Sequence, residues 1–332
     1  MNPPSTSFTL LDERKHRVLI LKMGYSETLD PDISGVVSLG DILRTTVILH
    51  AFPPERYEVT WLVDQKGVDL LKGNQYIHRI LTVNTFTSFH LMSDWFDVVV
   101  NFEKDPGICA MVDKISAWRR YGFRFDHVTH EAHAYDNSDQ ALSMSKSMSF
   151  KREQSKSWST MLYEMIGHPY KNEPYILGYQ PKSQEIYDIG LNHQVGGKFP
   201  IKRWPDPNWQ QLHDTLEGEY SLSWQQGMDN IESYIDWINS CRLLITNDSL
   251  GLHIALALGK KVIALFGPTK ANEVDEHSSL IKLLPDVNWT CMPCLGTSCH
   301  NPAGLCMDHI SQDRVIEAVK KQLSSHTETP YV

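Results

Sequence analysis

Short runs of consecutive apolar residues alternate along the first half of the chain with a segment whose apolar residues recur at helical spacing. The apolar runs lie at 17–22, 59–63 and 97–101 and contain no regular polar alternation. Such runs are typical of strands buried on both faces, as in a parallel sheet. The segment 41–52 has the spacing of a helix. Strands and helices in alternation predict an α/β fold.

The second half of the chain restarts this order of elements. The predicted strands are 185–191, 242–246 and 261–265, and the predicted helices are 208–216, 230–239, 250–258 and 313–323. A repeated order of this kind predicts two Rossmann-like domains that face each other across a cleft. Ligands of such sheets bind at the carboxyl ends of the strands.

The region between the two halves has a different composition. The stretch 124–157 is rich in His, Ser, Met and Lys, and we interpret it as a long surface excursion before a helix at 158–166. Pro174 and Pro181 bracket the expected crossing between domains. We therefore place an N-terminal domain at 1–175 and a C-terminal domain at 176–332.

Composition and charge narrow the function classes. The chain has 332 residues, 41% of them apolar and 21% charged, with a formal net charge of -9. An acidic chain is not expected to bind nucleic acid, because a basic field supplies most of that affinity. No apolar run reaches the roughly 18 residues that a membrane span needs, and the first residues lack the pattern of a secretion signal. We therefore expect a soluble, cytoplasmic protein without a nucleic-acid partner.

Polar turns follow two neighbouring predicted strands of the second half. Asp248 and Ser249 open the helix after 242–246, and Gly267-Pro268-Thr269 follows 261–265. Backbone N–H groups at a helix start favour an anionic ligand such as a diphosphate. The alternative is a capping aspartate and a tight turn without a ligand.

Two further loops combine glycine with charged residues. Asn192 is followed by Gly196, Gly197 and the cations Lys198 and Lys202. Glycine lets the backbone approach a phosphate and a cation neutralises it, although ordinary basic loops have the same composition.

The other loop follows the first strand and contains Lys22-Met-Gly24 and, later, Leu39-Gly40-Asp41. It lacks the spacing of dinucleotide and Walker phosphate loops. Asp41 lies where the helix begins, so its carboxylate either points into the cleft or caps the helix.

These segments together resemble the heptosyltransferase family of glycosyltransferases, glycosyltransferase family 9. The family has Lys-x-Gly and Leu-Gly-Asp near the N-terminus, matched here by Lys22, Gly24 and 39–41, and a Lys-x-Trp-Pro loop, matched by 202–205. It also has Asp-(Ser/Thr)-x-x-x-His-x-Ala before Gly-Pro-Thr, matched by 248–255 and 267–269. The order and the strand context agree over most of the chain.

The resemblance implies the GT-B architecture and an inverting transfer from a nucleotide-activated sugar, most often ADP-heptose, to a glycan or protein acceptor. It implies that Asp41 is the general base, that Lys202 lies on the diphosphate, and that no metal takes part in the chemistry. The expected donor-binding residues are Gly40, Asn192, Lys198, Lys202, Asp248, Ser249, Gly251, His253 and Thr269.

Two features depart from the family pattern. Leu250 follows Ser249, and the glycine that the family has at that place comes one residue later, as Gly251. The stretch 25–37 interrupts the compact glycine loop and would lie over the reaction centre as a lid, an acceptor contact or a tolerated loop. A sugar-nucleotide epimerase and a non-catalytic sugar-nucleotide-binding protein are the alternative functions.

Four cysteines fall close together near the C-terminus. Cys291, Cys294, Cys299 and Cys306 could supply four thiolates to a structural zinc or iron ion, a ligand set that suits a closed tetrahedral site. The cluster is similar to those of relatives that modify bacterial surface proteins, which implies an iron-holding role. Free thiols or two disulfides are the alternatives, and His300 or His309 could replace one cysteine.

The N-terminal half is locally basic. Arg119, Arg120 and Arg124 lie near a group of lysines at 146–156. Such a face would suit an anionic acceptor or the inner surface of a membrane, and the alternative is a solvated face. The expected partners are a nucleotide-sugar donor and a glycan or protein acceptor. A membrane surface is a further expected partner if this basic face is a binding face.

Overall fold

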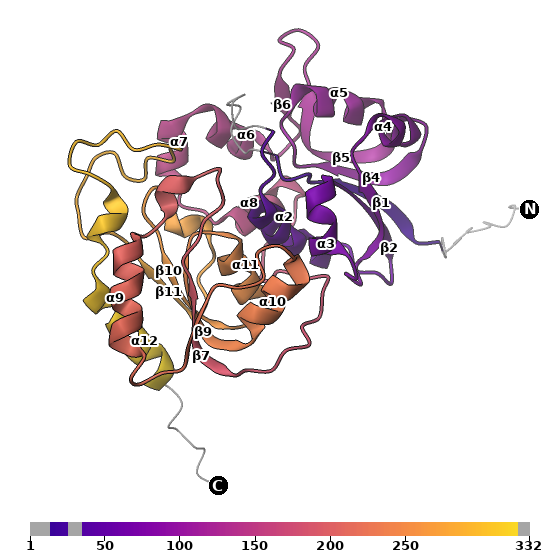
Figure 1. Cartoon of the computed structure of the whole chain (residues 1–332). Helices are drawn as coiled ribbons and strands as arrows, with labels where there is room; N and C mark the ends of the chain where they lie inside the picture. The colour runs from indigo at the N-terminus through magenta and orange to yellow at the C-terminus, as the bar shows by residue number, and fades with distance from the viewer. Residues whose placement is uncertain (1–13, 26–34, 325–332) are drawn as a thin grey trace, which may run out of the picture.

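The computed structural model describes residues 14–25 and 35–324, which form two mainly parallel sheets side by side (Figure 1). The first sheet has the order β3-β2-β1-β4-β5-β6, with only β6 antiparallel to its neighbour. The chain enters at β1 in the middle and builds outward in both directions, so the order reverses between β1 and β4. Its strands are β1 (His16–Leu21), β2 (Tyr57–Val63), β3 (Ile77–Thr82), β4 (Trp95–Asn101), β5 (Ser116–Phe125) and β6 (Ala132–Ala134).

Helices cover both faces of the first sheet. Helices α4 (Thr85–Met92) and α5 (Pro106–Lys114) pack over one face, where Leu91 and Val112 are fully buried. The other elements of this half are α2 (Leu39–Thr45), η1 (Thr46–Ala51), η2 (Gln65–Gly67), α3 (Val68–Leu71), α6 (Asp139–Lys146), α7 (Met148–Glu153) and α8 (Trp158–Met165).

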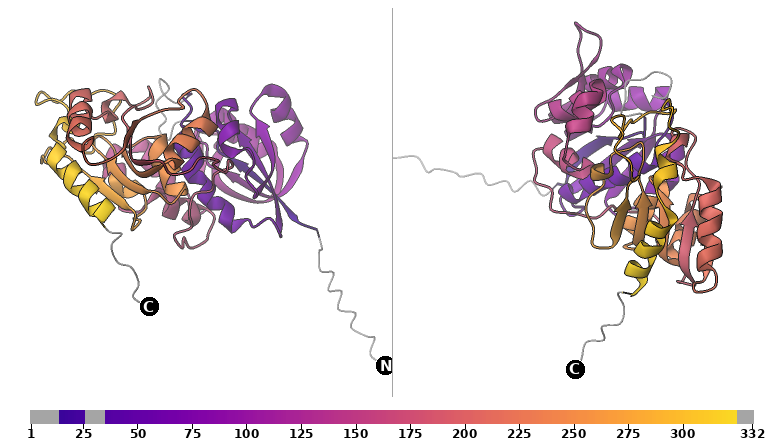
Figure 2. Two further views of the ribbon diagram at one scale, coloured as in Figure 1. Left: turned by 60° about the horizontal axis from the view of Figure 1, so that its bottom comes forward. Right: turned by 90° about the vertical axis from the view of Figure 1, so that its left-hand side faces the viewer.

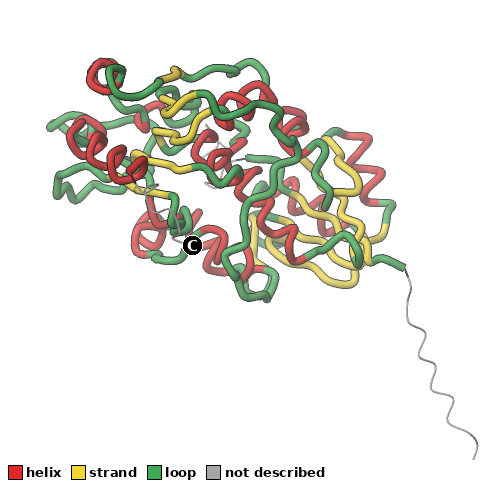
Figure 3. Tube along the Cα trace, turned by 90° about the horizontal axis from the view of Figure 1, so that it is seen from below, coloured by secondary structure: helices red, strands yellow, loops and turns green. Residues whose placement is uncertain are grey.

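The second sheet is parallel throughout and has the order β11-β10-β9-β7-β8. The strands that follow β9 are added on the opposite side of β7 from β8, so the strand order reverses between β7 and β9. Each sheet thus has a crevice at the carboxyl ends of its central strands. The strands are β7 (Tyr187–Asn192), β8 (Leu222–Trp224), β9 (Cys241–Asn247), β10 (Lys261–Leu265) and β11 (Leu280–Leu283). Figure 3 shows the two groups of strands with helices around them.

Helices α9 (Asp206–Leu216) and α12 (Gln312–Ser324) cover one face of this second sheet, and α10 (Ile231–Asn239) and α11 (Leu250–Ala257) pack toward the first half. Three short 3-10 turns complete the half, namely η3 (Pro200–Lys202), η4 (Ala271–Glu273) and η5 (Cys306–His309). This arrangement confirms the predicted α/β class with two Rossmann-like units.

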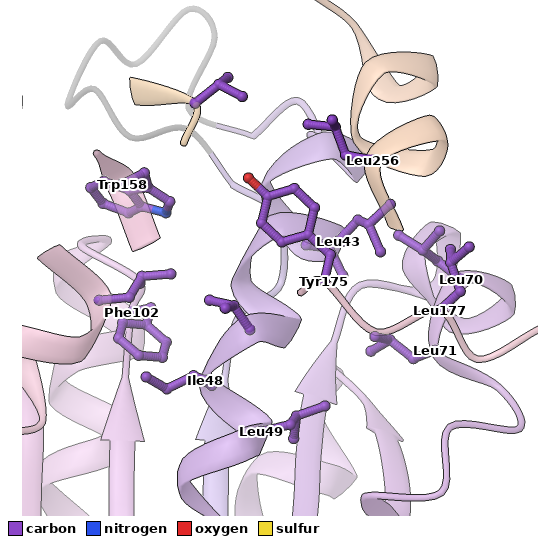
Figure 4. Close-up of a cluster of buried hydrophobic side chains, with 14 of the residues drawn as sticks. Leu43, Ile48, Leu49, Leu70, Leu71, Phe102, Trp158, Tyr175, Leu177 and Leu256 are labelled. Carbon is purple, nitrogen blue, oxygen red and sulfur yellow. The ribbon is translucent and has the colours of Figure 1, made fainter. Parts of the chain in front are cut away.

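The two halves share one buried apolar cluster. Helix α2 packs against α11, and Leu43 and Leu70 of the first half belong to the same cluster as Leu256 of the second (Figure 4). Tyr175 and Leu177, from the segment that joins the halves, pack into it as well. The halves therefore lie against each other along a largely apolar interface. The two further views of the ribbon show the halves side by side (Figure 2).

Polar contacts also join the halves, on the side of α7 and α8. The Lys270 ammonium donates to the carbonyls of Lys151 and Arg152 at 3.0 and 2.7 Å and also to that of Gln154. The buried Ser159 hydroxyl donates to Asp275 Oδ2 at 2.5 Å. These helices precede the predicted boundary at 175/176 but are held by side chains that follow it.

One predicted region was wrong. The stretch 124–157 is not an irregular excursion, because it contains the end of β5, then β6, α6 and α7. The short helix α7 is capped by Ser147, whose hydroxyl accepts from the Phe150 N–H. None of its residues is buried, so its sequence has no apolar periodicity that would predict a helix. The strands β3 and β5 were also missed, since both carry exposed polar residues near a sheet edge.

Among the described residues, no helix has the length and apolar character needed to cross a membrane.

Candidate functional site

A cleft of about 590 Å³ lies between the two halves. The start of α2 lines it from the first half, and the loop after β7, the start of α11 and the turn after β10 line it from the second. Eight predicted site residues line this cleft, namely Gly40, Asp41, Lys198, Lys202, Asp248, Ser249, His253 and Thr269. The structure thus brings together residues that are far apart in the sequence.

Asp41 lies in the first turn of α2 and is mostly buried. Its Oδ1 atom is 2.8 Å from a guanidinium nitrogen of Arg44, which lies one turn later on the same helix. The side chains of Asp41 and Arg44 are only 15% and 8% exposed. The carboxylate is therefore held by a cation at the wall of the cleft and bonds to a side chain of its own helix.

Asp248 accepts hydrogen bonds from residues of two other polar turns of the second half. Its Oδ2 atom accepts from the Lys202 ammonium at 2.8 Å and from the Thr269 hydroxyl at 2.7 Å. Burial acts to raise the pKa of Asp248, but the charge of Lys202 and these hydrogen bonds outweigh it and lower the pKa to about 2. Asp248 is consequently a carboxylate at neutral pH.

Two predicted donor contacts, Asn192 and Gly251, lie behind the wall of the cleft and do not line it. The fully buried Asn192 amide donates to Thr246 at 2.7 Å and to the Ser249 hydroxyl at 3.1 Å, and accepts from Tyr234 at 2.6 Å. A Cβ added at Gly251 would lie 2.4 Å from the Asn192 amide nitrogen. Gly251 thus makes room for the Asn192 side chain, which in turn positions Ser249.

His253 lies on α11 and packs against Gly40 of α2. Its ring lies 3.1 Å from the place of a Cβ on Gly40, so a larger residue there would press on the ring. Burial and the charge of Arg44 lower the pKa of His253 to about 4, against the opposing effect of Asp248 and Asp41. The imidazole is therefore neutral at neutral pH.

The predicted insertion 25–37 is described only at its two ends, and 26–34 lie outside the described residues. At its C-terminal end, the Val36 carbonyl accepts from the Lys198 ammonium at 2.9 Å, across the cleft. Directly before the insertion, the buried Glu103 accepts from the backbone N–H groups of Met23 and Gly24 at 2.5 and 3.0 Å. Glu103 therefore fixes the loop backbone after β1.

Sequence reasoning missed several residues that line the cleft. Arg44, Lys151, Lys270 and Glu273 also line the cleft, and Glu273 lies 3.7 Å from the Arg44 guanidinium and 3.9 Å from the Lys151 ammonium. Two of them had a sequence signal. Arg44 lies three residues after Asp41, a spacing that brings the two together on a helix, and Lys151 belongs to the predicted basic group at 146–156. Tyr234 also lines the cleft, although its sequence context favours a core residue.

The four clustered cysteines lie in one loop beside the cleft. All are free thiols, and burial together with the neighbouring thiols raises the pKa of Cys306 to about 11. The backbone N–H of Leu295, which lines the cleft, donates to the Pro268 carbonyl at 2.8 Å, so this loop supports the Gly-Pro-Thr turn.

The donor set of this loop fits zinc or iron, since thiolates are the ligands both ions favour. In the described residues, however, only His213, Asp214 and Glu217 on the surface of α9 place three ligand atoms within 4.8 Å of one another. No three of the four thiols lie that close to one another, so a shared ion would require the loop to tighten around it. The predicted metal site stays a prediction.

Comparison with known proteins gives a match in the second half of the chain. The model of glycosyltransferase family 9 (heptosyltransferase) matches residues 227–303, which include α10, α11 and part of the cysteine loop. A lipooligosaccharide heptosyltransferase 2 of Campylobacter jejuni is 36% identical over 81 residues. The match covers 24% of this chain and 26% of that relative, so only about a quarter of the curated relative is spanned.

Solved structures match over nearly the whole chain. The ADP-heptose LPS heptosyltransferase II of E. coli matches 94% of this chain and 100% of its own, with a TM-score of 0.63 and 13% identity. The iron-containing dodecameric glycosyltransferase TibC of enterotoxigenic E. coli matches 95% of this chain and 78% of its own, with a TM-score of 0.57 and 12% identity. At these identities the likeness is one of fold, the GT-B arrangement.

Proposed function

We propose that this chain is a glycosyltransferase of family 9 and that it transfers a heptose from ADP-heptose to a hydroxyl of a bacterial surface glycan or protein. One observation carries the proposal. Asp41 of the first half and the Lys202–Asp248–Thr269 group of the second half face the same cleft. On this proposal Asp41 serves as the base for the acceptor, and the group with Lys202 serves as the binding site for the donor diphosphate.

In the proposed reaction, the acceptor hydroxyl oxygen forms a bond to the anomeric carbon of the heptose. The bond from that carbon to the diphosphate oxygen breaks, ADP leaves with the electron pair, and the hydroxyl proton passes to Asp41. A single displacement of this kind inverts the anomeric centre. A positioned general base typically contributes about 10²–10⁴-fold to the rate.

The leaving diphosphate gains negative charge as the bond breaks. Lys198 and Lys202 lie on this side of the cleft, and Ser249 precedes the N–H groups at the start of α11. Fixed cations and helix-start amides stabilise such a charge without a metal ion. Asp248, which keeps its charge, is available to accept from hydroxyl groups of the donor sugar.

The cysteine loop has a supporting part in the proposal. Cys291, Cys294, Cys299 and Cys306 would hold a zinc or iron ion, which would supply a rigid cross-link to the loop and no reacting group. The similarity of fold to an iron-containing glycosyltransferase supports the idea, as does the contact of the loop with the turn that carries Thr269.

We further propose that the enzyme works in the cytoplasm against the inner face of the membrane. Phe86 and Phe89 project from α4 and are 86% and 61% exposed, and aromatic side chains on one helix face can enter a lipid interface. Vesicle sedimentation tests this part, because the Phe86→Ser/Phe89→Ser double variant should lose binding. Equal sedimentation of both proteins would remove the membrane contact from the proposal.

The test of the main proposal compares the wild type with Asp41→Asn. With ADP-heptose and a heptose-deficient lipooligosaccharide acceptor, the wild type should release ADP and add the mass of one heptose. The variant should lose most of this turnover, by about 10²-fold or more, and keep its calorimetric affinity for ADP-heptose. UDP-sugars and GDP-mannose serve as control donors.

The other outcomes separate the alternatives. A variant that keeps the full transfer rate would remove Asp41 as the base. Conversion of ADP-heptose without release of ADP would indicate an epimerase, and binding without any turnover would indicate a non-catalytic binding protein.

A further inference from the structure

Arg44 stands between the base Asp41 and the opposite half of the molecule. Its side chain is 8% exposed, and one guanidinium nitrogen lies 2.8 Å from Asp41 Oδ1. The other terminal nitrogen lies 3.7 Å from Glu273 Oε2, in the turn η4 of the second half. We propose that Arg44 is a positioning residue that orients the Asp41 carboxylate and ties its orientation to the docking of the two halves. This inference rests on the proposed function.

An arginine three residues after an aspartate is in itself a weak and common helix contact. Two features set this pair apart. Both side chains are mostly buried at the wall of the cleft, where a misplaced charge has little water to screen it. The arginine also has a carboxylate partner from the other half, which a local helix contact does not need.

The guanidinium is fixed from a third side. Its central carbon lies 5.2 Å from the ring centre of Trp158 on α8, a stacking distance for arginine on an aromatic ring. A planar guanidinium with separate donor edges can hold two carboxylates in a defined geometry, and a lysine ammonium cannot do so to the same degree. Arg44 therefore has few orientations in which all three contacts are kept.

Glu273 is held in turn by the first half. Its other oxygen lies 3.9 Å from the ammonium of Lys151 on α7. The order of charges is thus Asp41, Arg44, Glu273 and Lys151, and it crosses between the halves twice. Separation of the halves would move Glu273 away and leave Arg44 with one carboxylate in place of two.

The expected consequence concerns the orientation of the base more than the affinity of the cleft for the donor. A general base must lie within hydrogen-bond reach of the acceptor hydroxyl, and a shift of about 1 Å can cost about 10²-fold in rate. Arg44 acts through Asp41 and needs no contact with the donor. Its loss should therefore appear in kcat, with little change in donor binding.

The experiment measures kcat, KM for ADP-heptose and donor affinity for four full-length variants. Arg44→Met should lower kcat by about 10- to 100-fold, with KM and calorimetric Kd for ADP-heptose within about threefold of the wild type. Arg44→Lys keeps the charge and should restore part of the rate. Glu273→Gln should lower kcat less than Arg44→Met does, and the double variant should be no slower than Arg44→Met alone, because the two residues act in one chain of contacts.

A matched control is Arg242→Met. Arg242 makes a similarly short contact, 2.6 Å to Asp188, but lies away from the cleft at 42% side-chain exposure, so its removal should leave kcat unchanged. Thermal unfolding shows whether each variant is folded. If Arg44→Met does not fold, Arg44→Lys and Glu273→Gln decide the question.

Three results would overturn the inference. One is an unchanged kcat in Arg44→Met, another is an equal loss in kcat and donor affinity, and the third is additive effects of Arg44→Met and Glu273→Gln. Asp41→Asn, measured beside them, separates the two proposals. Loss of turnover in Asp41→Asn with a normal rate in Arg44→Met would leave the proposed function intact and remove only the role of Arg44.

Discussion

His253 is an imidazole buried between two helices from different halves, with charged residues on both sides. Arg44 and Lys202 act to lower its pKa, Asp41 and Asp248 act to raise it, and burial exceeds each of these effects. Because its pKa is about 4 in the folded protein and about 6.5 in an unfolded chain, the unfolded state binds the proton first as the pH falls. The contribution of His253 to stability is therefore complete above about pH 6.5 and decreases toward pH 4.

This linkage predicts a pH-dependent loss of stability. From pH 7 to pH 5, the free energy of unfolding should fall, with at most about 1.4 kcal/mol per pH unit due to His253. Urea unfolding at several pH values measures the slope. His253→Asn should have a shallower slope than the wild type over this range, although other histidines still contribute to both. Equal slopes for the two proteins would contradict a neutral, buried His253.

Single residues differ in how well their sequence context predicts their place. The position of Asp248 at the cleft follows from a strand that ends just before a helix begins, which puts it at the carboxyl rim of a sheet. Asp41 lies in the first helix after β1, although the stretch 25–37 separates that helix from the strand. The place of Asn192 does not follow, since a residue at a strand end can face the cleft or lie behind it. The pairing of Arg44 with Glu273 depends on the docking of the halves, about which no local pattern gives information.

At the scale of elements, the first turn of helix α11 needs a glycine at 251, because the side chains of Asn192 and Tyr234 pack against it. An alanine in place of a helical glycine usually adds roughly 1 kcal/mol of stability. At Gly251 the sign should reverse, because the new Cβ would lie 2.4 Å from Asn192 Nδ2 and 2.5 Å from the Tyr234 hydroxyl oxygen.

Gly251→Ala should therefore destabilise the protein by about 1–3 kcal/mol, as overpacking usually does. It should also weaken donor binding, since the Asn192 amide that holds Ser249 must move. Gly218→Ala is the control, with no atom within 4 Å of the added carbon. Chemical denaturation and donor calorimetry measure the two effects. A Gly251→Ala protein as stable as the Gly218→Ala control would contradict the close packing.

The cysteine loop is an element whose order we expect to depend on an ion. Metal analysis of the purified protein should find about one zinc or iron per chain, and Cys306→Ser should lose most of it and unfold at a lower temperature. Cys109→Ala is the control, because that thiol is buried in the first half, away from the loop. A metal-free wild type that unfolds at the same temperature with and without a chelator would leave the loop as a set of free thiols.

Elements with an uninterrupted apolar run or a clear amphipathic period were easier to predict than those without one. The central strands have runs of apolar residues that only a doubly covered sheet accommodates, and α12 has a clear amphipathic period. The strand β5 escaped prediction because Arg119, Arg120 and Arg124 interrupt its apolar residues. Helices α6 and α7 are short and held by contacts with other parts of the chain, so their local sequences carry little information about them.

At the scale of the whole molecule, the halves are joined by an apolar core and by charged contacts around it. Lys270 provides the densest of these polar contacts, with three carbonyl acceptors at and after the end of α7. An ammonium that replaces water with several carbonyls stabilises the helix end to which they belong.

Lys270→Met should thus destabilise the protein by about 1–3 kcal/mol and speed hydrogen exchange of amides at 148–154. The matched control is Lys146→Met, which removes an exposed pair with Glu131 and should change stability by less than about 1 kcal/mol. Exchange at 148–154 that is equally slow in the wild type and in Lys270→Met would show that other contacts hold α7.

The contacts of α7 and α8 have a consequence for building hybrid enzymes from two parents. A crossover at 175/176 would take 147–165 from one parent and 270–275 from the other, and so break the pairs Lys270–Arg152 and Ser159–Asp275. A crossover before 147 keeps those pairs but parts Tyr163 from the Val47 carbonyl, to which it donates at 3.0 Å. Donor and acceptor specificities will therefore recombine best when the second parent supplies 147–165 together with everything that follows, and the η1 turn of the first parent keeps a backbone position that can accept from Tyr163.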